Sequence, residues 1–177
     1  MWARLKARER GQAMAEFGVI AVAALALALV VIDLGRALNY EQVMVGLTRQ
    51  GSDLASRGDS VTESATAVVN GSTPLDLNKN GEVIVTSVQC AVGARTCTGG
   101  SNTITDQATL GSLSQGSHIG TLGGKNPPTL SAQATAMLQP GQTIYITEVY
   151  YSFQPITPLG NLVKAVMPSS LYEAAYF

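Results

Sequence analysis

The fold is decided by residues 11–37, which read GQAMAEFGVIAVAALALALVVIDLGRA. Between Phe17 and Ile32 no side chain is charged or strongly polar. As a helix, residues 12–32 would be ~32 Å long, close to the ~30 Å thickness of the hydrocarbon core of a bilayer. Apolar residues lie all the way round such a helix, which therefore lacks the single apolar stripe of a helix packed on a soluble core. We expect residues 12–33 to be the membrane-spanning half of a helix.

The segment before this run sets its orientation. Met1–Arg10 contains four basic residues and one acidic residue, a formal charge of +3. Basic residues that flank a membrane helix tend to stay in the cytoplasm, so the chain after Ile32 is expected to be exported. The same charge argues against the alternative that the apolar run is the buried core helix of a soluble protein.

Gly11 and Glu16 stand at the mouth of the apolar run. A carboxylate at this place is costly in lipid and is a candidate functional group for that reason. A cleaved secretory signal would need a small-residue cleavage site in polar sequence, but Ala24-Leu25-Ala26 is embedded in apolar sequence. An uncleaved signal anchor explains the charge and the apolar run and leaves Gly11 and Glu16 without a role.

The stretch Gly11-Gln12-Ala13-Met14-Ala15-Glu16-Phe17 resembles the processing site of type IV pilin-like proteins. Together with Ile32-Asp33-Leu34-Gly35-Arg36-Ala37 and Thr48-Arg49-Gln50-Gly51, it is similar to the TadE-like pseudopilins of tight-adherence (Tad, or Flp) pilus systems. The resemblance covers about residues 10–55.

Two positions depart from the pattern of that family. A proline often lies early in the apolar run, where this chain has Val22 or a neighbour. The Arg-Glu-Gly-Ala of the family reads Arg49-Gln50-Gly51-Ser52 here. Neither departure touches the processing site.

The resemblance implies that a prepilin peptidase removes the basic leader, residues 1–11, by cutting between Gly11 and Gln12. The cut creates an α-amine on Gln12, with a reference pKa of ~8. Glu16, with Phe17 beside it, would then act in assembly by pairing its carboxylate with the amine of its own or a neighbouring subunit, which relieves the cost of a charge in a dry assembly.

The implied function is that of a structural minor pilin or pseudopilin in a Tad-type pilus for adhesion or secretion. Its partners would be the prepilin peptidase, other pilin subunits and the pilus assembly platform of the bacterial inner membrane. The N-terminus would be cytoplasmic and the C-terminal domain periplasmic, or extracellular in an assembled pilus. Two alternatives stay open: a type II secretion pseudopilin, and an uncleaved membrane-anchored binding domain.

Loss of the leader would change the net charge from −1 to −4. An acidic exported domain offers no basic stripe, which argues against nucleic acid as a partner. No serine–histidine–acid set, glycine-rich phosphate loop or pair of carboxylates on one element is evident. We therefore expect the chain to be a substrate of a peptidase and not an enzyme.

The helix is expected to continue beyond the membrane to about residue 57, because apolar or small residues recur at the spacing of one helical face. The residues on this face are Ala37, Tyr40, Met44, Leu47, Gly51 and Leu54. Arg57-Gly58 is a typical helix end. Residues 34–58 are thus predicted to be an amphipathic, exported half of the helix that needs a cover.

The cover must come from residues 59–177. Glu82–Cys90, Gln142–Phe153 and Ser169–Phe177 have the composition or alternation of strands. Short helices are expected at Thr129–Leu138 and Leu159–Val166. These elements predict a pilin-like α+β fold, with one long N-terminal helix packed on a small antiparallel sheet.

Residues 93–128 are rich in glycine, serine and threonine and predict a long flexible loop. His118 lies in it without an acidic or thiol neighbour in sequence and is expected to be simply exposed. Cys90 and Cys97 are the only cysteines, and in an oxidising compartment such a pair is expected to form a disulfide.

Asp76, Asn78 and Asn80, followed by Gly81, resemble the opening of a calcium-binding loop. The twelfth position of such a loop is Ser87 instead of glutamate, and Asn80-Gly81 before a strand is also a turn signal. Calcium is therefore a weak candidate ligand, and no other cofactor is expected.

Overall fold

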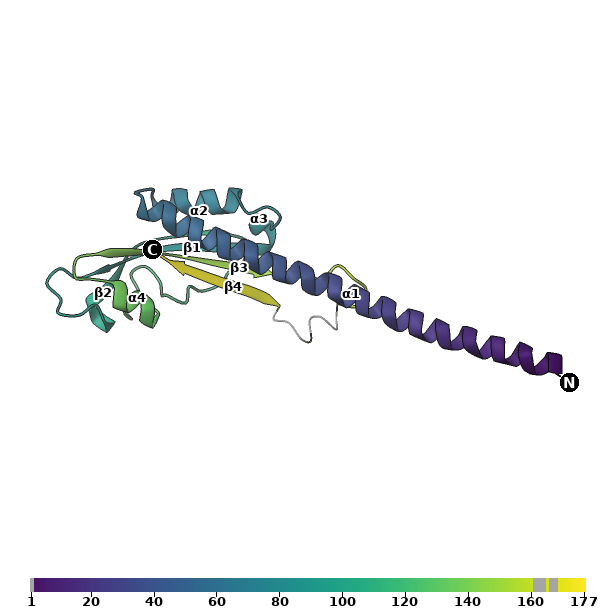
Figure 1. Cartoon of the computed structure of the whole chain (residues 1–177). Coiled ribbons are helices and arrows are strands. Elements are labelled where there is room, and N and C mark those ends of the chain that lie inside the picture. The colour runs from purple at the N-terminus through teal and green to yellow at the C-terminus, as the bar shows by residue number, and fades with distance from the viewer. Residues whose placement is uncertain (1, 161–164, 166–168) are drawn as a thin grey trace. The chain divides into compact units, whose positions relative to one another are not determined.

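The computed structural model describes residues 2–160, 165 and 169–177, and of residues 2–11 it describes the backbone alone. Its elements (Figure 1) are α1 (Trp2–Ser56), α2 (Val61–Asn70), α3 (Leu77–Asn80), β1 (Gly81–Cys90), the 3₁₀ helix η1 (Gly99–Ser101), β2 (Asn102–Gly111), α4 (Ala132–Met137), β3 (Thr143–Ser152) and β4 (Ser170–Tyr176). The chain divides into two compact units. The N-terminal unit contains residues 1–38 and 154–169, and the sheet unit contains residues 39–153 and 170–177.

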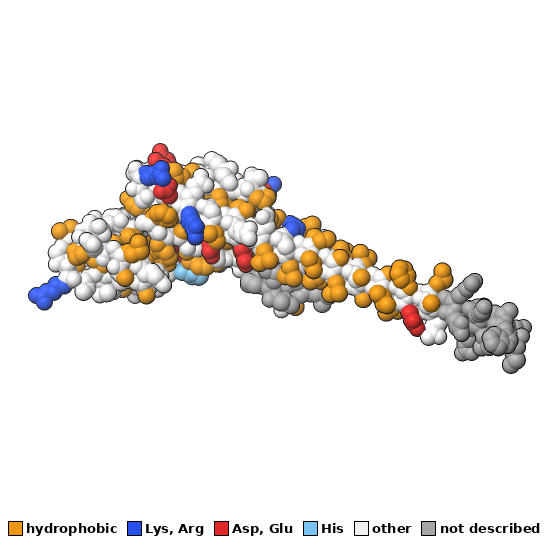
Figure 2. Space-filling model, viewed as in Figure 1, with side chains coloured by type: hydrophobic (Ala, Val, Ile, Leu, Met, Phe, Trp, Pro, Cys, Tyr) orange, Lys and Arg blue, Asp and Glu red, His pale blue; other side chains and the backbone are white. Residues whose placement is uncertain are grey.

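In the N-terminal unit, the apolar part of α1 is not covered by protein. Side chains from residue 12 to 32 are mostly exposed, with Phe17 at 72% and Val22 at 70%. Orange apolar side chains cover most of the visible face of this part of the helix in Figure 2. Within the described residues, α1 is the one helix that is long and apolar enough to cross a membrane. A bare apolar helix of this length suggests membrane anchoring.

The sheet unit contains an antiparallel sheet with strand order β2-β1-β3-β4. Its central strand β1 is buried almost throughout, because both faces of the sheet are covered. Figure 1 shows α1 and α2 on one face and α4 on the other. The predicted α+β fold, with a long N-terminal helix on a small antiparallel sheet, is confirmed.

The amphipathic half of α1 lies against this sheet largely by its predicted face. Met44, Leu47 and Gly51 are buried. The ring of Tyr40 meets those of Tyr151 and Phe153 edge-on, with centroids 5.4 and 6.0 Å apart. The helix ends one residue before the predicted residue 57, and Gly58 follows with a φ of 111°, which favours glycine.

Helix α2 was not among the predicted elements, although its start signal is present in the sequence. The Ser60 hydroxyl accepts a hydrogen bond from the Glu63 amide, and the Glu63 carboxylate accepts one from the Ser60 amide. This reciprocal cap follows from a serine with a glutamate three residues later. The Ser60 hydroxyl and the Ser60 amide both donate to the Glu63 carboxylate, and these two hydrogen bonds lower the pKa of Glu63.

The prediction of a flexible loop over residues 93–128 is wrong for Asn102–Gly111. These residues form β2, which pairs with β1 from Glu82 opposite Gly111 to Cys90 opposite Asn102. β2 lies at the edge of the sheet and is only partly buried, so it needs few bulky apolar residues. Its polar composition was therefore read as loop.

Other predicted elements agree in place more than in extent. β1, β3 and β4 confirm the three predicted strands to within one residue at each end. α4 is shorter than the predicted Thr129–Leu138. The expectation that Met137 shares an apolar face of this helix with Ala134 and Leu138 is wrong, because Met137 is 72% exposed while the other two are buried. Of the helix predicted at Leu159–Val166, residues 161–164 and 166 lie outside the described residues.

The predicted disulfide is present between Cys90 and Cys97, with an S–S distance of 2.07 Å. Both cysteines are buried and pack with Leu138 at the end of α4. The bridge therefore ties the end of β1 to the segment that leads into β2.

α1 packs tightly against β3 at Gly51, which gives a first prediction. A Cβ at Gly51 would lie 2.7 Å from Thr147 Oγ1 and 2.8 Å from Val68 Cγ2, too close for a real contact. We expect Gly51→Ala to lower the free energy of unfolding by about 1–3 kcal/mol. Gly46→Ala is the matched control, because nothing lies within 4 Å of a Cβ there. Thermal unfolding of the full chain in detergent compares them, and equal stability of the two variants would contradict this packing.

Candidate processing and assembly site

The predicted processing site lies within α1. The backbone at Gly11 and Gln12 is helical. Residue 1 and the side chains of residues 2–11, and hence the charges of the predicted leader, lie outside the described part. What the structure describes from Gln12 onward is one continuous helix that leads directly into the apolar run.

Glu16 lies one helical turn after Gln12 and its carboxylate reaches back to it. Gln12 Nε2 donates a hydrogen bond of 2.9 Å to Glu16 Oε1. Both side chains are exposed, as is Phe17. The Glu16 carboxylate is therefore within reach of residue 12, where cleavage would create an amine, and it remains open to a second molecule.

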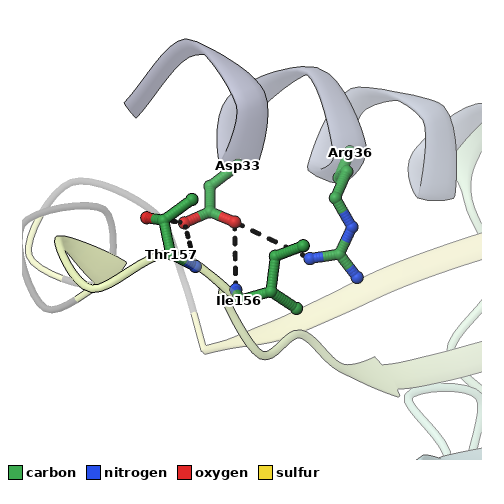
Figure 3. A network of polar contacts seen from close by, with 4 residues as sticks. All are labelled: Asp33, Arg36, Ile156 and Thr157. Carbon is green, nitrogen blue, oxygen red and sulfur yellow. Dashed lines mark hydrogen bonds and ion pairs between the residues drawn. The ribbon is translucent and has the colours of Figure 1, made fainter. Parts of the chain in front are cut away.

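A second carboxylate, Asp33, stands where the apolar run ends, and it is fully buried. Asp33 Oδ1 accepts a hydrogen bond of 3.0 Å from the Ile156 amide. Asp33 Oδ2 accepts from the Thr157 amide at 3.3 Å and from the Thr157 hydroxyl at 2.5 Å. Arg36 Nη1 lies 3.6 Å from Asp33 Oδ1, one turn further along the helix (Figure 3).

This network explains how a charge can be buried there. A buried carboxylate is tolerated when hydrogen bonds and an opposite charge replace its hydration. Asp33 has three donors and one guanidinium for this purpose. In return it holds residues 156 and 157 beside the helix, although they are more than 120 positions away in the sequence.

Asp33 and Arg36 belong to the motif at residues 32–37 that resembles TadE-like proteins, but the sequence did not predict their contacts. An acid at the exit of an apolar helix with an arginine three residues later is a recognisable signal. No pattern around Gln154–Gly160 pointed to a partner for it.

A third carboxylate, Glu148, is buried in the sheet unit and was not predicted to be a site. Glu148 Oε1 accepts from the His118 amide at 2.9 Å, the Tyr172 hydroxyl at 3.0 Å and the Tyr150 hydroxyl at 3.3 Å. Glu148 Oε2 accepts from the Ser117 hydroxyl. Burial and the Glu148 charge raise the pKa of both tyrosines.

The Glu148 cluster holds the segment around residue 118 on the sheet face opposite α1. His118 is exposed as predicted, but its ring lies 4.4 Å from that of Tyr172, and its amide is bound to Glu148. These partners come from β3 and β4 and leave no signal near His118 in the sequence.

The candidate calcium residues lie in a different local structure from the one predicted. Asp76 is the N-cap of α3, where it accepts from the Lys79 amide, and its other oxygen lies 3.4 Å from Lys79 Nζ. Asn78 and Asn80 are in the single turn of α3. No group of three histidine, cysteine or acidic side chains suited to a metal occurs among the described residues. Calcium binding by these residues stays an untested prediction.

The Asp33 network generates a second prediction. We expect Asp33→Ala to increase hydrogen exchange of the Ile156 and Thr157 amides at least tenfold, because each loses a charged acceptor. Asp53→Ala is the control, since Asp53 is on the same helix but forms an exposed ion pair with Arg57 at 2.8 Å. Mass spectrometry of a peptide that covers residues 154–160 measures the exchange in the full chain. Unchanged exchange in Asp33→Ala would show that these hydrogen bonds do not hold the segment.

Comparison with known proteins concerns the part of α1 that contains Glu16 and Asp33. No curated protein and no solved structure matches the chain. A family model described as TadE-like protein matches residues 11–53. The match includes Glu16 and Asp33 and confirms the resemblance that the sequence motifs indicated. The chain thus carries a TadE-like segment that begins at Gly11, the residue at which processing was predicted, and ends at Asp53.

Proposed function

We propose that this chain is a structural minor pilin of a Tad-type pilus, processed after Gly11 and assembled through Glu16. The observation that carries the proposal is the start of the TadE-like match at Gly11, directly before the part of α1 whose apolar side chains have no protein cover. TadE-like proteins are pilus components, so a role in such a system is the natural reading of the match.

Membrane insertion with the basic end inside would leave the Gly11–Gln12 bond at the cytoplasmic face. A prepilin peptidase would hydrolyse this bond, giving a carboxylate on Gly11 and an amine on Gln12. Removal of the +3 leader also takes away the cytoplasmic charges that hold a membrane helix in place. The product is a helix that an assembly platform can extract from the bilayer into a filament.

Glu16 would guide this extraction. Its hydrogen bond to the Gln12 side chain supports this role, because the carboxylate reaches the residue on which the cut would create the amine. In the membrane the amine of the same subunit would partner Glu16. In a filament the amine of a neighbouring subunit would do so, because a buried carboxylate needs an opposite charge.

The third prediction tests processing. In a host with the pilus system, the membrane-bound protein is expected to begin at Gln12. Gly11→Val is expected to retain residues 1–11, because a bulky side chain would obstruct the cut. Gly18→Ala, at a helical glycine with open space around it, should be processed normally. Amino-terminal sequencing and intact mass measure the outcome. A wild-type protein that begins at Met1 would favour the uncleaved anchored binding domain.

The fourth prediction tests assembly. Glu16→Gln is expected to be cleaved normally but to reduce co-purification with other pilus subunits at least tenfold, because the amide cannot neutralise an amine. Glu41→Gln, an exposed acid further along α1, is the control. Cross-linked membranes probed for the subunits of the Tad pilus and of a type II secretion pseudopilus measure both. Unchanged assembly in Glu16→Gln would overturn the role of this carboxylate, and cross-links only to type II subunits would favour the other system.

A further inference from the structure

We propose that residues 155–160 form a turn that rests on the bilayer surface, with Ile156 in the headgroup region beside the exit of α1. The partner is a phospholipid interface. The inference rests on the membrane anchoring in the proposed function and goes beyond it by assigning a second contact with lipid.

The turn lies at the level where α1 leaves the apolar run. Ile32 is the last residue of that run, and Asp33, the next residue, binds the amides of Ile156 and Thr157 at 3.0 and 3.3 Å. Figure 3 shows the Ile156 side chain beside the helix between Asp33 and Arg36. A membrane boundary near Asp33 therefore passes close to Ile156.

The backbone of this turn is suited to a place where water is scarce. Irregular backbone near lipid needs an internal partner for every donor. Pro155 and Pro158 have no amide hydrogen, and the amides of Ile156 and Thr157 are bound to Asp33. From residue 155 to residue 158, every backbone donor is thus either absent or satisfied within the protein.

The turn is also closed on itself. The Gly160 amide donates to the Thr157 carbonyl at 3.0 Å. Gly160 is buried, and a Cβ there would lie 2.6 Å from the Pro155 ring. The turn is therefore a compact unit and not a loose loop.

The side chain that this turn presents outward is apolar. Ile156 is 69% exposed, although the Asp33 hydrogen bonds hold its backbone firmly. Its partner Asp33 directly follows Val31 and Ile32 in the chain, and these two side chains are 65% and 50% exposed. Arg36, which pairs with Asp33, can extend its charge toward the headgroups at the same level. An apolar residue beside a cation at the end of a membrane helix matches the chemistry of the interface.

The experiment uses the full chain in phospholipid vesicles with a fluorescent label on one new cysteine. The two native cysteines are bridged, so Ile156→Cys supplies a single reactive thiol. Lipids that carry a nitroxide at a shallow or a deep position then report the depth of the label. Leu25→Cys is the reference within the apolar run, and Val92→Cys, 87% exposed in the sheet unit, is the reference for an exposed apolar site.

We expect the label at residue 156 to be quenched at least twofold more by the shallow nitroxide than by the deep one. The label at residue 25 should be quenched by the deep nitroxide, and the label at residue 92 by neither. Quenching at Leu25 without quenching at residue 156 would overturn this inference and leave the membrane anchoring of the proposed function intact. Absence of quenching at both would overturn both. Protection of residue 156 that depends on protein density and not on lipid would assign the turn to a second copy and also overturn the inference.

Discussion

The sheet unit depends on the contact between the amphipathic half of α1 and the face of β3 that carries Thr147 and Tyr151. Gly51 brings the helix backbone against Thr147, and the Tyr40 ring meets Tyr151 further along the same face. A sheet with apolar side chains must bury them against another element to be stable. The helix supplies one cover, and the segment held by Glu148 supplies the other. A central strand that is buried on both faces is possible only with both covers in place.

Buried carboxylates supply much of the long-range order that apolar packing does not. Asp33 and Glu148 each accept three hydrogen bonds from segments distant in sequence. A carboxylate has several acceptor positions and no donor, so it gathers amides and hydroxyls from irregular segments. Removing such a group exposes the donors to an environment without partners, which costs more than the loss of an ordinary contact. These residues therefore specify where the loops lie.

The sequence predicted what local pattern controls and missed what distant contacts decide. The C-terminal end of α1, the three predicted strands and the disulfide follow from periodicity, β-branched composition and the count of cysteines. The backbone of α1 is already helical at Trp2, before the predicted start at residue 12. β2 was missed because an edge strand can be polar. The sequence contains the capping signal of α2 at Ser60 and Glu63, but the helix was not predicted from it. The partners of Asp33 could not be predicted, since no sequence pattern at residues 156 and 157 indicates a contact with the end of the apolar run of α1.

Glu16 and Asp33 mark the two ends of the apolar run of α1, and their surroundings differ in a way that fits different tasks. Asp33 is buried and satisfied by groups of its own chain, so it has no need of another molecule. Glu16 is exposed and shares one side-chain hydrogen bond with Gln12. Moving Glu16 from an interface into a dry assembly would remove its water, and the bond to a neutral amide would not compensate for that loss. A new amine on residue 12 would compensate, so under the proposed processing the same helix would be stable as a membrane anchor before cleavage and suited to assembly after it.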